Sequence, residues 1–161
     1  MAEIRSIAVV ALAGLGVLIS ADLAAFQVGL VATVWDPIFG DGSRQVLTSP
    51  LSRAFPIPDA LVGATAYGLD LLLAIGLVLR VWRPAILAAM LAVLAVLGAV
   101  VAISLAIAQP LIAHAGCTLC LCSTAVSIAL AASAVAEARA RWPSLPRPSQ
   151  PLTRSPREEP R

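Results

Sequence analysis

The sequence predicts an all-α integral membrane protein: a four-transmembrane-helix bundle with a structured outer loop between the first and second spans. Of its 161 residues, 60% are hydrophobic and only 12% are charged, whereas an average soluble domain carries about 25% charged residues. The mean hydropathy is +0.93. Four apolar segments approach or exceed the roughly 20 residues that a helix needs to cross the hydrocarbon core. The arginines are also divided very unequally between the two sides that these segments define.

The four spans are predicted at residues 6–25, 60–79, 84–108 and 117–138. Helices are expected because an open sheet would leave backbone polar groups unpaired in lipid. Residues 81–83 form so short a link that the second and third spans should make an antiparallel hairpin. The first segment has an alternative interpretation as a cleaved signal peptide, although its apolar run continues past Asp22 without the usual break.

The charge distribution predicts the orientation. Nine of the eleven arginines fall on one side: Arg5, Arg80, Arg83, Arg139, Arg141, Arg147, Arg154, Arg157 and Arg161. Only Arg44 and Arg53 fall on the other side, so the positive-inside rule places both termini in the cytoplasm. All basic residues are arginine and alanine is abundant, a composition typical of a GC-rich bacterial genome. We therefore expect a multi-pass protein of the bacterial cytoplasmic (inner) membrane, with its functional site at the outer face.

The chain divides into a membrane domain, residues 1–140, and a Pro/Arg-rich cytoplasmic tail, residues 141–161. The tail has no apolar periodicity and is expected to be disordered. Membrane lipid is an expected partner of the first part, and we expect no nucleic acid to bind.

All three cysteines lie within six residues, "CTLCLC", where a turn meets the last span. Cys117 and Cys120 have the C-x-x-C spacing, which puts them on one face of a first helical turn. At an oxidising outer surface such a pair tends toward a disulfide, whereas Cys122 points away. Half of a zinc site, with His114 as the nearest further ligand, and simple apolar packing are the alternatives. We predict no metal site.

The outer loop is the second informative stretch. It reads "WDPIFGDGSRQVLTSPLSRAFPIPDALVGATAY". Within it, residues 46–55 are expected to form a short amphipathic helix on the membrane surface. Pro58 and Asp59 are expected to start the second span, as residues of a helix beginning.

This loop, followed by a C-x-x-C that opens the last span, resembles the vitamin K epoxide reductase family. The resemblance covers residues 6–138 and is most specific in "VLTSP", "IPDALVG…Y" and "CTLC". It implies a four-helix bundle that holds a membrane quinone, menaquinone or ubiquinone, near the outer surface. It also implies that this quinone is coupled to thiol–disulfide chemistry.

The resemblance assigns roles by position. Cys117 and Cys120 match the active-site pair, with Cys120 next to the quinone and Cys117 exchanging with an incoming thiol. Ser49 matches the loop hydroxyl, and Asp59 falls where the family often has an asparagine that hydrogen-bonds the quinone carbonyl. Thr124 stands where the family can have a quinone-facing tyrosine.

The chain departs from its family in the outer loop. The family usually has two further cysteines there, which carry electrons to the active-site pair, and the matching positions hold Trp35 and Ser43. Neither residue can exchange disulfides. Electrons would therefore pass directly between Cys117 and a periplasmic thioredoxin-like protein or a thiol client.

Two other functions stay open at this point. The bundle can be a non-catalytic membrane subunit or assembly factor in which the cysteines form a static link. It can also be a small transporter or lipid-binding bundle, because Asp22 and Asp70 fall within apolar segments and intramembrane carboxylates often mark a pathway.

Overall fold

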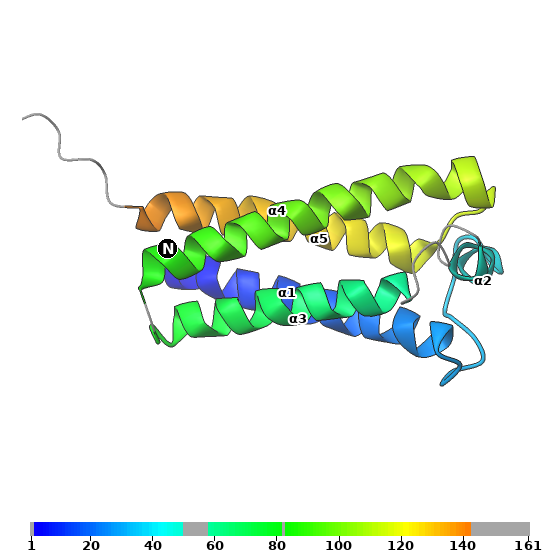
Figure 1. The fold of residues 1–161 in the computed structure, drawn as a ribbon, viewed down its shortest axis with the longest axis horizontal. Coiled ribbons are helices and arrows are strands. Elements are labelled where there is room, and N and C mark those ends of the chain that lie inside the picture. Colours follow the sequence, from blue (N-terminus) through cyan, green and yellow to red (C-terminus); the bar gives the residue numbers. More distant parts are fainter. Residues whose placement is uncertain (1, 50–57, 82, 143–161) are drawn as a thin grey trace, which may run out of the picture.

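The computed structural model describes residues 2–49, 58–81 and 83–142, and within them it is helical with no strand (Figure 1). The elements are α1 (Ala2–Gln27), α2 (Gly42–Thr48), α3 (Asp59–Val78), α4 (Pro84–Ala108), the π-helix η1 (Gln109–Ala113) and α5 (Thr118–Arg141). Four helices are long and apolar enough to cross a membrane: Ile4–Gln27, Asp59–Val78, Pro84–Ala113 and Thr118–Arg141. These match the four predicted spans and suggest a multi-pass membrane protein.

The four long helices form a closed ring. α1 packs on α3 and α5, and α4 packs on the same two helices, while α2 sits at one end (Figure 1). Small residues at the contacts, including Ala13, Ala88 and Ala134, are fully buried and let the backbones approach closely. Because Val9 and Ala13 of α1 belong to this core, the first segment is part of the bundle, which favours a span over a signal peptide.

Tyr67 crosses the middle of the ring from α3 to α5. Its hydroxyl lies 2.5 Å from Ser127 Oγ and donates to the carbonyl of Ser123 at 2.9 Å. The aromatic ring of Tyr67 lies against Gly16 of α1, where a Cβ atom would overlap it. These hydrogen bonds satisfy a phenol inside an apolar bundle, so they tie two helices that do not otherwise pack together.

A charged cluster closes the opposite end of the bundle. Glu137 of α5 is fully buried and accepts hydrogen bonds from Arg141 Nε at 2.7 Å and Ser6 Oγ at 2.9 Å. Arg141 Nη2 lies 2.6 Å from the same carboxylate, and Arg5 Nε lies 3.6 Å from its second oxygen. We call these four residues the Glu137 cluster; it joins the start of α1 to the end of α5.

Prolines decide two helix boundaries. Pro110 lacks an N–H and crowds the carbonyl four residues earlier, which explains why α4 widens into the π-helix η1. In the outer loop the predicted helix at residues 46–55 is wrong in its bounds, because α2 begins at Gly42 and ends at Thr48. Ser49 is extended, with ψ at 162°, as expected for a residue that precedes a proline.

Part of the sequence-based description lies outside the described residues. This applies to residues 50–57 of the outer loop and to residues 143–161 of the predicted tail. The last helix, α5, reaches Arg141.

Candidate active site

Cys117 and Cys120 are joined by a disulfide, with their Cα atoms 5.2 Å apart. Cys122 is free and exposed. Both findings agree with the helical geometry of the C-x-x-C spacing. Because the disulfide occupies both sulfurs, the pair is not half of a zinc site in this state. In the described part of the chain, no three His, Cys, Asp or Glu side chains gather into a metal-binding group.

The end of the third span positions Cys117. Cys117 is the extended N-cap of α5, and its Sγ accepts the N–H of Cys120 at 3.1 Å. Its own N–H donates to Oε1 of Gln109 at 3.2 Å, and Gln109 is itself buried, at 4% exposed. Gln109 was not among the site residues predicted from the sequence. The available signal is a glutamine directly before a proline at the end of an apolar span.

The disulfide lies in a packed group of apolar side chains that we call the outer cluster. Its buried members are Leu23, Val46, Leu47 and Cys117, and its half-buried members are Ile19, Phe26, Val34, Ala60, Ala113, Ala115, Leu119 and Cys120. They come from α1, α2, the start of α3, and both sides of the turn before α5. The fold therefore gathers four separate segments around one redox-capable bond.

Asp36 is the main polar link between the outer loop and the disulfide. Its Oδ2 accepts the N–H and the hydroxyl of Ser43, at 2.9 and 2.6 Å. Its Oδ1 accepts the N–H of Phe39 at 3.0 Å and the hydroxyl of Thr118. Thr118 directly follows Cys117, so one carboxylate joins the loop, the first turn of α2 and the first residue of α5. We call this arrangement the Asp36 clamp.

The hydrogen bonds of the Asp36 clamp favour the charged form of Asp36. Burial raises the pKa of Asp36, but the hydrogen bonds from Ser43, Thr118 and Phe39 outweigh it and hold the pKa well below its usual range. A lowered pKa in the folded state means that this stabilisation is complete above the ordinary aspartate pKa. It is lost only as the pH falls through the lowered value.

Close backbone packing accompanies the clamp. A Cβ at Gly42, the first residue of α2, would overlap the carbonyl of Gly116. A Cβ at Gly116 would lie 2.7 Å from the Phe39 ring. Glycine at both positions is therefore what allows the loop to press against the turn that leads into Cys117.

Asp36 was likewise not among the site residues predicted from the sequence. Its signal is the run "DPIFGDGS", since an aspartate before a turn often accepts backbone N–H groups further along that turn. Nothing local in the sequence indicates the bond to Thr118.

The three predicted quinone contacts each form a hydrogen bond within the protein. Ser49 ends α2 and donates its hydroxyl to the carbonyl of Val46 at 2.7 Å. Asp59 starts α3 and accepts Nε2 of Gln27 at 2.5 Å, while the next residue, Ala60, packs in the outer cluster. Thr124 lies one turn after Cys120 and donates to its carbonyl at 2.8 Å. Each side chain is thus engaged within the protein.

The two positions that hold cysteines in the family are very different from one another here. Trp35 is 70% exposed, whereas Ser43 is 1% exposed at the start of α2. Ser43 is bonded to Asp36, the neighbour of Trp35 in the chain. The segment that begins at Trp35 is therefore held to Ser43 through Asp36.

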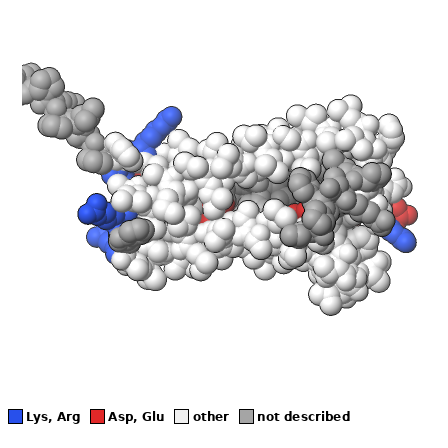
Figure 2. Space-filling model, in the orientation of Figure 1, with Lys and Arg blue, Asp and Glu red and all other residues white. Residues whose placement is uncertain are grey.

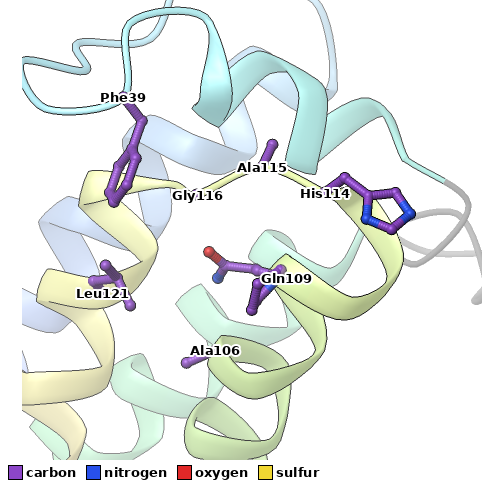
Figure 3. A pocket seen from close by; sticks show the side chains of 8 residues that line it. Phe39, Ala106, Gln109, His114, Ala115, Gly116 and Leu121 are labelled. Atoms are coloured by element: carbon purple, nitrogen blue, oxygen red, sulfur yellow. The ribbon is translucent and has the colours of Figure 1, made fainter.

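A pocket of about 440 Å³ opens between the end of α4 and the start of α5 (Figure 3). Its lining residues are Phe39, Ala106, Gln109, Pro110, His114, Ala115, Gly116 and Leu121. Figure 3 shows the Gln109 side chain directed into it. Neither active-site cysteine and none of the three predicted quinone contacts lines this pocket, so it lies beside the candidate site and not within it.

The two carboxylates within the spans differ from each other. Asp22 is exposed on α1. Asp70 of α3 is 3% exposed, and its Oδ1 has no hydrogen-bond partner among the described residues.

Comparison with known proteins gives one match. The sequence model of the vitamin K epoxide reductase family matches residues 7–135, a region that includes the outer loop, the Asp36 clamp and the C-x-x-C pair. No curated protein and no solved structure gives a significant match.

Proposed function

The chain belongs to the vitamin K epoxide reductase family, which suggests a membrane thiol–disulfide oxidoreductase, and on this premise we propose that it exchanges electrons between protein thiols and a membrane quinone through Cys117 and Cys120. One observation carries the proposal: a C-x-x-C disulfide enclosed by the outer cluster at one end of a bundle of membrane-spanning helices. An apolar enclosure suits a lipid-soluble reactant, and a vicinal dithiol is a two-electron donor.

The two sulfurs have separate roles. Cys120 is the thiol that faces the quinone, and Cys117 is the thiol that exchanges with an incoming thiol. In one turnover the two cysteine S–H bonds break, the S–S bond forms, and two electrons and two protons convert the quinone into quinol.

The chemistry of the residues assigned to the quinone supports this proposal. The outer cluster supplies apolar walls, and Ser49 and Thr124 each carry one hydroxyl proton. The two hydroxyls donate to the backbone carbonyls of Val46 and Cys120. If either hydroxyl turned to donate to a quinone carbonyl, no buried donor would be left unpaired. Asp59 accepts from Gln27; as a carboxylate it accepts hydrogen bonds, and it can donate to a ring carbonyl only when protonated.

The test is single-turnover quinol formation. The purified protein, reduced chemically and freed of reductant, is mixed with a water-soluble menaquinone or ubiquinone analogue in a stopped-flow spectrometer. We expect one quinol per protein, with no quinol from Cys120→Ala. Cys122→Ser is the matched control and should behave like the wild type, because Cys122 is outside the disulfide. If the reduced wild type forms no more quinol than Cys120→Ala, the oxidoreductase proposal fails.

We further propose that the disulfide faces the outside of a bacterial inner membrane, with both termini in the cytoplasm. Figure 2 shows basic side chains gathered at the end of the bundle that holds the N-terminus, whereas basic and acidic side chains stand together at the other end. This distribution supports a cytoplasmic location for the arginine-rich end.

Membrane-impermeant maleimide tests this orientation. In a variant without native cysteines, Asp41→Cys, an exposed loop position, should label in intact cells. Arg139→Cys, exposed near the end of α5, should label only after permeabilisation. The reverse pattern would overturn the assignment.

A non-catalytic membrane subunit is the second candidate. The complete burial of Cys117 and the absence of both loop cysteines favour a static disulfide. This candidate predicts no quinol formation, and the stopped-flow experiment therefore decides between the two functions. Transport is a third candidate that rests only on Asp70.

A further inference from the structure

Cys117 presents an access problem. If the proposed function holds, its sulfur must be attacked by a thiolate from outside the membrane, and yet Cys117 is 0% exposed. It packs with Leu23 of α1 and with Val46 and Leu47 of α2. Thiol–disulfide exchange needs a direct approach of the attacking sulfur to the disulfide, so part of this cover must move.

Of the cover on Cys117, the part that is held least by packing is α2 with the described residues that precede it, 34–41. The long helices pack along their whole length, whereas α2 has seven residues and makes only small contacts with α1, η1 and α5. Among the described residues, the bond from the Thr118 hydroxyl to Asp36 is a side-chain hydrogen bond that links this segment to α5. The same carboxylate also holds the loop on itself, through Ser43 and Phe39.

We propose that Asp36 is a positioning residue for thiol exchange, whose bond to Thr118 holds α2 closed on Cys117 and must break before an incoming thiol reaches the sulfur. In the family the positions of Trp35 and Ser43 carry cysteines, and here the carboxylate of Asp36, the neighbour of Trp35 in the chain, accepts hydrogen bonds from Ser43. A hydrogen bond opens and closes without oxidation or reduction. Access to Cys117 in this chain therefore depends on the clamp and not on the redox state of a loop disulfide.

A dithiol donor reduces the Cys117–Cys120 disulfide in two exchange steps. A donor dithiol attacks Sγ of Cys117 as a thiolate, a bond forms between the donor sulfur and Cys117, and Cys120 leaves as a thiolate and takes a proton. The second thiol of the donor then attacks the donor sulfur that is bonded to Cys117, and Cys117 is released as a thiolate that takes a proton. The donor ends as a disulfide and the pair ends as two thiols. Only the first attack requires access to Cys117.

The experiment measures the reduction rate of the disulfide in the full-length protein, with no quinone present. Thiols are trapped with an alkylating reagent at set times and counted by mass. Two donors are compared, dithiothreitol and a thioredoxin. The variants are Thr118→Val, which removes one hydroxyl with little change in shape, and Asp36→Asn. The matched control is Asp41→Asn, a loop carboxylate that makes no side-chain cap bond at the start of α2.

We expect Thr118→Val and Asp36→Asn to be reduced about tenfold faster than the wild type, the effect of losing one hydrogen bond to a charged group. The gain should be larger for thioredoxin than for dithiothreitol, because a protein donor needs a wider opening. Asp41→Asn should match the wild type. If both clamp variants keep the wild-type rates with both donors, even with a lowered Tm, Asp36 is a structural residue only and the proposal is wrong.

Two further readouts separate the possible failures. Should Asp36→Asn not fold, Thr118→Val alone decides the proposal, since it leaves the bonds from Ser43 and Phe39 in place. After chemical reduction, the folded clamp variants should form quinol as fast as the wild type, because the clamp governs access from outside and not the quinone step. If no variant and no wild-type sample forms quinol, the proposed function fails, while the reduction rates still judge the clamp.

Discussion

Restoring a cysteine pair in the outer loop, by Trp35→Cys together with Ser43→Cys, is expected to raise the rate at which a thioredoxin-like donor reduces Cys117–Cys120 by about 100-fold, the lower end of the gain that an effective local concentration provides. Trp35 is exposed to a donor, and Ser43 lies at the start of α2, whose later residues pack against Cys117. A reduced loop pair would deliver a thiol from within the same molecule, whereas the wild type must receive each donor by collision.

The single variants are the controls for this prediction. Ser43→Cys alone removes the serine hydroxyl from Asp36 and so weakens the clamp, which raises access without a relay. Trp35→Cys alone leaves the clamp bonds intact. Only a gain in the double variant beyond the product of the two single effects indicates a relay. If the double variant is reduced no faster than Ser43→Cys, the loop positions do not communicate with the active-site pair.

The largest expected loss of stability follows from Arg141→Ala at the other end of the bundle. Glu137 is fully buried, and this change leaves its carboxylate with Ser6 and the more distant Arg5. Removing one partner of a buried ion pair costs about 3 kcal/mol of the free energy of unfolding. Thermal unfolding in detergent should show a clearly lowered Tm.

Arg139→Ala is the matched control, because Arg139 is exposed on the same helix two residues away. Its effect should stay within about 0.5 kcal/mol. Replacing Glu137 and Arg141 together by leucine should cost less than Arg141→Ala alone, since no unpaired charge remains buried. If Arg141→Ala and Arg139→Ala lower the Tm equally, the Glu137 cluster does not stabilise the fold.

Much of the bundle could be predicted from sequence because its causes are local. Each span is a continuous apolar run, and a chain in lipid must satisfy its backbone within the helix. The Cys117–Cys120 pairing follows from three-residue spacing at a helix start, and the structure contains that disulfide. The prediction of α2 was wrong in its bounds: the apolar pattern continues past Ser49, but Pro50 disfavours helical backbone at that residue.

The surroundings of the disulfide were decided by tertiary structure alone. Asp36 and Thr118 are 82 positions apart, and Ser6 and Glu137 are 131 apart, so no pattern along the chain links either pair. Only the closed ring of four helices brings the outer loop onto the start of α5 and the N-terminus onto its end. The sequence by itself determined which segments are helices and which cysteines pair, because hydropathy and helical spacing act over a few residues. The folded bundle determined how Cys117 is enclosed and which polar groups hold the enclosure shut, because hydrogen bonds form between whichever groups packing places within about 3 Å.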